Sequence, residues 1–277
     1  MELSLSATVG LDNGVAMPLL GLGTYRSARG AEVEGSVAAA LRQGYRSIDT
    51  ASLYENEESI ASAIRASGVA REEIFLASKV WNDEQGYEST LAACERSLAR
   101  LDTDYLDLYM AHWPLREHLA STWRAMEELL AAGKARAIGV CNFLPHHVQE
   151  LLRTAKVAPM VDQVEFHPRL QQPGLQAYLA EHDIVLEAWA PIMRGRVDGI
   201  PELVEIGDAH GKSPAQVSIR WILQMGYVAI PKSVHAERVA ENADVFDFEL
   251  SDDEMEAIDR LDAGERIGPD PDVMGGW

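Results

Sequence analysis

Residues 74–112 read IFLASKVWNDEQGYESTLAACERSLARLDTDYLDLYMAH. Apolar runs occupy 74–80 and 105–112, and between them apolar residues recur at helical spacing over 87–100. Nearly continuous apolar runs that are joined by a helix are typical of parallel strands buried on both faces. The stretch therefore predicts one strand–helix–strand unit of a parallel sheet covered by helices.

The same alternation extends to both sides of this stretch. We expect strands at 19–23, 46–51, 74–80, 105–112, 135–141, 160–166, 183–190 and 227–233. We expect helices at 31–43, 57–66, 87–100, 119–132, 145–153, 173–181 and 213–225. Eight such units in 277 residues fit an α/β fold of the (β/α)8 TIM barrel type better than an open dinucleotide-binding sheet. The open sheet would also need a G-x-G-x-x-G turn that opens a helix, and no such turn occurs.

The two ends of the chain add simpler elements. Asn13-Gly14, a tight-turn dipeptide between short apolar runs, predicts an N-terminal β-hairpin. Residues 263–277 are rich in Gly, Pro and Asp and predict a C-terminal loop. Because no linker or change of composition divides the chain, we expect residues 1–277 to form a single domain.

The chain is strongly acidic, with 44 Asp and Glu against 24 Lys and Arg and a net charge of −20. Such a surface argues against non-specific binding of nucleic acid and against docking on anionic lipid. It is typical of a well-solvated protein, and adaptation to high salt is the alternative interpretation.

The sequence also predicts where the protein works. No apolar run reaches the length of a membrane span, and the N-terminus lacks the regions of a signal peptide. Cys94 and Cys141 are too few for a disulfide framework. We therefore expect a cytoplasmic protein with reduced thiols and with no nucleic-acid or membrane partner.

Polar residues at the expected strand ends are the candidates for catalysis, because a TIM barrel carries its active site there. Asp49, Lys79 and His112 end three successive strands, 30 and 33 residues apart, and Tyr54 follows Asp49 after a short loop. A buried lysine needs a partner, and Asp49 is available. We expect this pair to lower the pKa of Tyr54 from about 10 and so make it a general acid near neutral pH. A purely structural ion pair and a core histidine are the alternatives.

Six motifs surround these residues and follow in order along the chain. They are GYRSIDTASLYENE (44–57), SKVW (78–81), AHWP (111–114), IGVCNF (138–143), QVEFHP (163–168) and IPKSV (230–234). Together they resemble the motifs of the aldo-keto reductase family over essentially the whole chain. The short loops after the fourth and seventh strands and Trp189 are most similar to the bacterial 2,5-diketo-D-gluconate reductase group.

This resemblance implies an NADPH cofactor and the reversible reduction of a small-molecule carbonyl substrate. It implies that Tyr54 donates the proton to the developing alkoxide and that Lys79, held by Asp49, tunes Tyr54. It implies that His112 forms a hydrogen bond with the carbonyl oxygen. The expected substrates are dicarbonyls, aromatic aldehydes or keto sugar acids. With the acidic surface, the resemblance favours a monomer.

The resemblance also implies which residues hold the cofactor. Cys141, Asn142 and Gln163 are expected at the nicotinamide carboxamide, and Trp189 against the nicotinamide ring. The adenosine end is expected to be held by Lys232, Ser233, Val234, Arg238, Glu241 and Asn242. Lys232 and Arg238 are a local pair of cations on an acidic protein, which suits a 2′-phosphate and predicts a preference for NADPH over NADH.

Three departures from the family pattern bear on cofactor affinity. Cys141 stands where Ser is usual, which weakens one hydrogen bond to the carboxamide. Asp162 stands where Asn is usual and places a carboxylate near the cofactor site. Residues 191–195 read PIMRG in place of the usual Pro-Leu-Gly, which predicts a stiffer loop over the pyrophosphate.

Four aromatic residues are expected to line the substrate entrance: Tyr25, Trp81, Trp113 and the C-terminal Trp277. Aromatic walls suit small apolar or polyol carbonyl compounds. They are equally typical of ordinary barrel packing, so the sequence names no single substrate.

Two other functions compete with carbonyl reduction. A metal-dependent barrel hydrolase needs converging His and carboxylate ligands. His146 and His147 are adjacent on an expected helix and are expected to point to different sides, so we predict no metal site. A non-catalytic NADPH-binding redox sensor or scaffold is the second alternative, because the sequence does not exclude slow cofactor release.

Overall fold

Eight parallel strands form the centre of the protein. The computed structural model describes residues 3–277, and the order of the strands in the sheet follows the chain. The strands are β3 (Leu22–Gly23), β4 (Ser47–Asp49), β5 (Phe75–Val80), β6 (Leu106–Ala111), β7 (Ala135–Cys141), β8 (Val161–Glu165), β9 (Val185–Trp189) and β10 (Val228–Ala229). Parallel bridges from Leu20 to Ala229 and from Gly23 to Lys232 join the first strand to the last. The sheet thereby closes into a barrel, which confirms the (β/α)8 prediction.

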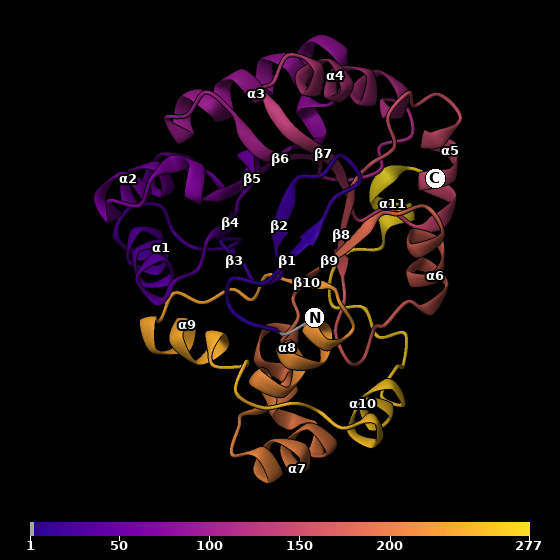
Figure 1. Cartoon of the computed structure of the whole chain (residues 1–277). Helices are drawn as coiled ribbons and strands as arrows, with labels where there is room; N and C mark the ends of the chain where they lie inside the picture. Colours follow the sequence, from indigo (N-terminus) through magenta and orange to yellow (C-terminus); the bar gives the residue numbers. More distant parts are fainter. Residues whose placement is uncertain (1–2) are drawn as a thin grey trace.

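Helices surround this barrel on its outside (Figure 1). Those at the expected positions are α1 (Ala31–Gln43), α2 (Glu57–Ser67), α3 (Tyr87–Leu101), α4 (Leu119–Ala131), α5 (Pro145–Leu152), α6 (Pro173–Glu181) and α8 (Pro214–Gln224). Their buried apolar side chains belong to the same hydrophobic core as the strands of the barrel. The strand–helix alternation of the sequence is therefore confirmed.

The start of α8 shows how local sequence sets a helix boundary. The Ser213 hydroxyl accepts a hydrogen bond from the Gln216 amide at 3.3 Å, and the Gln216 side chain accepts one from the Ser213 amide at 2.9 Å. Pro214 occupies the first helical position, where its missing N–H costs nothing. This capping box satisfies two amide groups that the helix leaves free.

Besides the three-residue turns η1 (Ser52–Tyr54), η2 (Arg71–Glu73) and η3 (Asn82–Glu84), five helical segments of the described residues lie where the sequence pattern predicts none: η4 (Met193–Gly199), α7 (Pro201–His210), α9 (Ala236–Ala243), α10 (Asp252–Asp259) and α11 (Pro271–Gly275). Most of them are short and bury few side chains; α10 buries only Ile258. A helix of two turns with one buried residue leaves no periodic apolar stripe to detect. The C-terminal segment, residues 263–277, is a loop except for α11.

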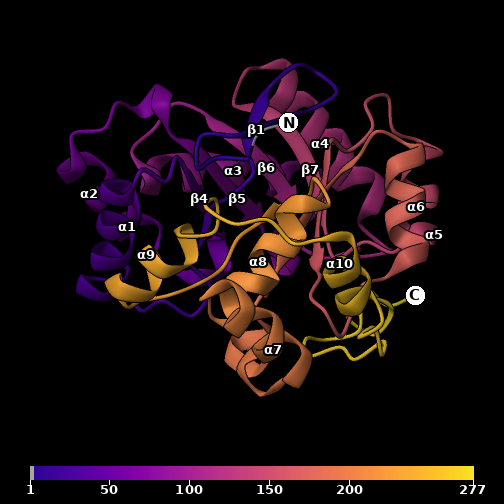
Figure 2. The ribbon, with the colours of Figure 1, turned by 60° about the horizontal axis from the view of Figure 1, so that its bottom comes forward.

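Figure 2 shows β1 (Thr8–Gly10) of the N-terminal hairpin at the top of the molecule and the C-terminus lower down, beside α10. The expected hairpin pairs β1 with β2 (Ala16–Pro18), and Gly14 takes the left-handed conformation in its turn, with φ 83°. Over residues 3–277, no helix is both long and apolar enough to cross a membrane.

Candidate active site

The four candidate catalytic residues meet at the carboxyl end of the barrel. Asp49 ends β4, Lys79 lies on β5, His112 follows β6, and Tyr54 lies in the short helical turn η1 (Ser52–Tyr54). The Lys79 ammonium group donates to both Asp49 carboxylate oxygens at 2.7 Å and to the Thr50 carbonyl at 2.8 Å. The expected ion pair is therefore present, and Lys79 is fully buried. Removing water from a charged group costs free energy, which only a well-placed partner such as Asp49 offsets.

Tyr54 lies directly over this ion pair. The Lys79 Nζ atom is 5.3 Å from the centre of the Tyr54 ring. The Tyr54 ring is 5.8 Å from the His112 ring and 5.1 Å from the Tyr25 ring, centre to centre. A phenol, an ammonium group and an imidazole from three strand ends therefore surround one point.

The expectation that the ion pair lowers the pKa of Tyr54 is wrong for this structure. Burial raises the pKa of the Tyr54 phenol above its usual value, and this effect outweighs the opposing charge of Lys79. Asp49 neutralises much of that charge, because both of its oxygens accept from Lys79. Tyr54 consequently keeps its proton at neutral pH, as a general acid must.

Lys79 is charged and His112 is neutral at physiological pH. Burial opposes the charge of Lys79, but the contact with Asp49 prevails and raises the pKa of Lys79. Burial, together with the nearby Lys79, lowers the pKa of His112 well below its usual range. The site therefore holds a permanent cation beneath Tyr54 and a neutral imidazole beside it, which can form a hydrogen bond with an uncharged carbonyl oxygen.

A cavity of about 740 Å³ opens over these residues. Predicted residues that line it are Tyr25, Asp49, Tyr54, Trp81, His112, Trp113, Cys141, Asn142, Gln163, Trp189, Lys232, Ser233, Val234, Arg238, Glu241 and Asn242. Lys79 lies beneath the floor, and Trp277 is not among the lining residues. The cavity thus joins the expected catalytic and cofactor positions in one continuous space.

The middle of the cavity carries amide groups whose orientation the protein sets. Asn142, with φ 65°, donates from Nδ2 to the His112 carbonyl at 3.0 Å and accepts at Oδ1 from Trp189 Nε1 at 2.9 Å. The Cys141 thiol donates to Gln163 Oε1 at 3.6 Å. Asp162, by contrast, does not line the cavity, so the expected carboxylate at the cofactor site is absent; it accepts a long bond of 3.4 Å from the Phe143 amide.

The cavity lining is more basic than the chain as a whole. Four Lys and Arg residues line the cavity against three Asp and Glu, while the whole chain has 24 against 44. Among residues 3–277, neither Lys232 nor Arg238 forms an ion pair. Unpaired cations in a cavity of an acidic protein favour a ligand that carries phosphate.

Comparison with known proteins decides the family. A model of the Aldo/keto reductase family matches residues 19–263. The chain belongs to this family. It is therefore an oxidoreductase, and the family resemblance read from its motifs is confirmed.

Individual relatives cover nearly the full length of this reductase. It is 55% identical over 274 residues to the glyoxal reductase of Bacillus subtilis, covering 99% of each chain. It is 46% identical over 270 residues to the methylglyoxal reductase DkgA of Salmonella typhimurium, covering 96% of this chain and 97% of that one.

Solved structures share the fold closely. An aldo-keto reductase from a Medee basin deep-sea metagenome library matches with a TM-score of 0.93 at 42% identity, over 96% of this chain and 98% of that one. The Bombyx mori aldo-keto reductase in complex with NADP matches with a TM-score of 0.90 at 30% identity, over 98% of each chain.

Some residues that line the cavity of the reductase lie outside the family motifs, so the sequence analysis did not predict them. Arg26, Arg194, Pro269 and Met274 all line the cavity. Arg194 lies in the unusual 191–195 stretch, where its φ of 56° turns the chain sharply. The only sequence signal for it was the departure of this stretch from the family pattern.

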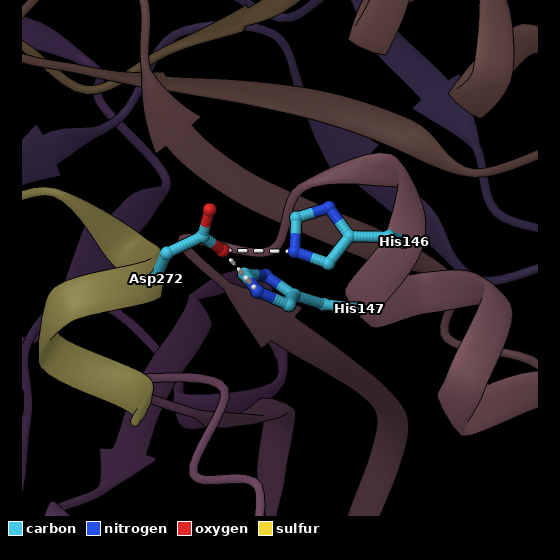
Figure 3. A group of neighbouring side chains, drawn as sticks. All are labelled: His146, His147 and Asp272. Atoms are coloured by element: carbon cyan, nitrogen blue, oxygen red, sulfur yellow. Dashed lines mark hydrogen bonds and ion pairs between the residues drawn. The ribbon is translucent and has the colours of Figure 1, made fainter. Parts of the chain in front are cut away.

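The C-terminal segment contributes Pro269 and Met274 to the cavity lining, and its Asp272 faces two histidines of α5 (Figure 3). Nε2 of His146 and Nε2 of His147 both lie 2.8 Å from Oδ1 of Asp272. The expectation that the two histidines point to different sides is therefore wrong. They occupy the first turn of α5, and both rings turn toward α11, so their centres are 4.0 Å apart.

The hydrogen bonds of His147 decide what this cluster can hold. Nδ1 of His147 accepts a bond from the Leu144 amide at 3.0 Å, which requires its lone pair. The neutral ring must then carry its proton on Nε2, the atom that faces Asp272. A metal ion would need that position deprotonated, so we assign the cluster to fixing the C-terminal segment.

Acid is expected to weaken this attachment. Burial, with His146 nearby, lowers the pKa of His147 to about 4, although Asp272 opposes the shift. In the unfolded chain the pKa of His147 is near 6.5, so below that pH the unfolded chain binds a proton that the folded protein does not. The folded state therefore has its full stability above pH 6.5 and loses stability as the pH falls toward 4. Urea unfolding should show a loss of about 2 kcal/mol between pH 7 and pH 5 from this group.

The variant His147→Asn isolates that contribution. It should flatten the decrease between pH 7 and pH 5, while His146→Asn, which changes a half-exposed ring, should retain it. An equal decrease in wild type and His147→Asn would assign the acid sensitivity to other groups.

Proposed function

We propose that this protein reduces small aldehydes and ketones with NADPH. When bound, the nicotinamide supplies the hydride to the carbonyl carbon. Tyr54 donates its proton to the developing alkoxide, the Lys79 cation stabilises the phenolate that remains, and neutral His112 orients the carbonyl oxygen. The observation that carries this proposal is the buried Lys79–Asp49 pair beneath Tyr54 at the cavity floor.

The cavity walls support small substrates with little charge. Tyr25, Leu53, Trp81, Trp113 and Met274 present mainly apolar surface near the catalytic end. Relatives named glyoxal reductase and methylglyoxal reductase support short dicarbonyl compounds as the first candidates. Aromatic aldehydes and keto sugar acids, the substrates of the 2,5-diketo-D-gluconate reductase group, are the finer alternatives.

Oxidation of NADPH, followed at 340 nm, tests the proposal directly. The panel contains methylglyoxal, phenylglyoxal, an aromatic aldehyde, a diketo sugar acid and a simple ketone. Turnover of the dicarbonyls is the expected result. Binding of NADPH without turnover of any compound would favour the non-catalytic sensor, and absence of both would overturn the proposal.

A preference for NADPH over NADH is expected from the basic residues that line the cavity. Lys232→Gly combined with Arg238→His should abolish the preference, mainly through a weaker Kd for NADPH, because both changes remove a cation from the 2′-phosphate position. Fluorescence titration with both cofactors measures it. Lys156→Gly, a change of an exposed lysine outside the cavity, is the control and should leave the preference intact. Equal use of NADPH and NADH by the wild type would contradict the assignment.

A further inference from the structure

Inside the barrel, one amide group is held between two carboxyl groups. Nε2 of Gln163 donates to Asp49 Oδ2 at 2.9 Å and to Glu187 Oε2 at 2.9 Å. Gln163 lies on β8, Glu187 on the neighbouring β9, and Asp49 on β4. All three side chains are buried. Glu187 does not line the cavity and belongs to none of the family-like motifs.

This arrangement leaves the Gln163 amide only one orientation. A primary amide has two N–H groups, and the two carboxyl oxygens use both of them. A flipped amide would point its own oxygen at the Asp49 carboxylate, which can only accept, and would lose the bond to it. Oε1 of Gln163 consequently faces the cavity, where its protein contact is the weak 3.6 Å bond from the Cys141 thiol.

We infer that Glu187 is a positioning residue, which with Asp49 holds Gln163 so that an oxygen acceptor faces the amino group of a bound nicotinamide carboxamide. This inference rests on the proposed function. Without Glu187, the Gln163 amide keeps one carboxyl partner and can rotate, so it no longer presents a single group to the ligand. Glu187 touches neither substrate nor cofactor position, and its effect passes through Gln163.

The charge state of Glu187 provides a readout that simple packing would not change. Burial and the neighbouring Asp49 raise the pKa of Glu187 to about 8, although Gln163 and Lys79 oppose the shift. Among the described residues, its Oε1 atom has no hydrogen-bond partner. Above pH 8 a second negative charge therefore appears beside the Lys79–Asp49 pair. It disfavours the phenolate that forms on Tyr54, so kcat for reduction should fall.

Two substitutions separate these roles. Glu187→Gln keeps an acceptor for Gln163 but cannot ionise, so its Kd for NADPH should stay within about threefold of wild type while the decrease of kcat above pH 8 disappears. Glu187→Leu removes the acceptor, and its Kd for NADPH should rise about tenfold, the loss of one buried hydrogen bond. Asp162→Asn is the matched control, because it removes a buried carboxyl group next to Gln163 on β8 that does not contact the Gln163 amide, and it should keep the decrease above pH 8.

The measurements are NADPH binding by fluorescence quenching and kcat from pH 6 to pH 9.5 for all four proteins. A Kd for Glu187→Leu equal to that of wild type would overturn the inference, as would an unchanged pH profile in Glu187→Gln. If Glu187→Leu does not fold, Glu187→Gln still decides through its pH profile. Failure of the wild type itself to bind or oxidise NADPH would count against the proposed function instead.

Discussion

Tyr54→Phe is expected to lower kcat for carbonyl reduction by roughly 10²–10⁴-fold, the contribution of a positioned proton donor. The substitution removes only the hydroxyl group, so the ring contacts with Tyr25 and His112 remain. The Kd for NADPH and the free energy of unfolding should therefore change little. Single-turnover oxidation of NADPH with methylglyoxal measures the chemical step apart from product release.

Tyr25→Phe is the matched control for this experiment. Its ring lies 5.1 Å from that of Tyr54, but it is 44% exposed and is not a hydrogen-bond partner of Lys79, which donates to Asp49 and Thr50. We expect its kcat to stay within about threefold of wild type, because no proton donor is lost. Similar kcat values for Tyr54→Phe and wild type would show that another group donates the proton.

Lys79→Met is expected to destabilise the protein by about 3–5 kcal/mol, because it leaves the Asp49 carboxylate buried without its cation. Lys79 is completely buried and supplies three short hydrogen bonds, two to Asp49 and one to the Thr50 carbonyl. Activity should also be lost, since no cation remains to stabilise the phenolate of Tyr54. Urea unfolding and kcat report the two effects separately.

The double variant Lys79→Met with Asp49→Asn separates the contribution of Lys79 to stability from its contribution to catalysis. Replacing the whole pair by uncharged groups of similar size should recover most of the lost stability, because no unpaired buried charge remains. It should not recover activity. If kcat returned together with stability, Lys79 would act only as a structural residue, and its catalytic assignment would fail.

Periodicity and spacing were sufficient to predict the barrel and to place the candidate catalytic residues at one rim. A strand–helix repeat is a local pattern, and equal spacing along a closed parallel sheet brings strand ends such as Asp49 and Lys79 to one rim. The short helices α10 and α11 escaped detection, because a helix that buries one or two side chains has no apolar stripe.

Contacts between segments far apart in the sequence decided the pKa of Tyr54 and the orientation of His146 and His147. The pKa of Tyr54 rises because neighbouring walls exclude water, and no pattern around residue 54 reports this. His146 and His147 converge because α11, more than 120 residues later, brings Asp272 to the first turn of α5.

Glu187 is a further residue whose role is visible only in the tertiary structure. In the sequence it is one acidic residue in an apolar run, without a motif or a partner at any fixed spacing. Pairing of the neighbouring strands β8 and β9 brings it within 2.9 Å of Gln163, whose amide also reaches Asp49 on β4 across the barrel. The sequence by itself determined the repeat, the candidate catalytic residues and the resemblance to the family. The tertiary structure decided charge states and orientations, because these depend on which groups exclude water and share hydrogen bonds across the barrel.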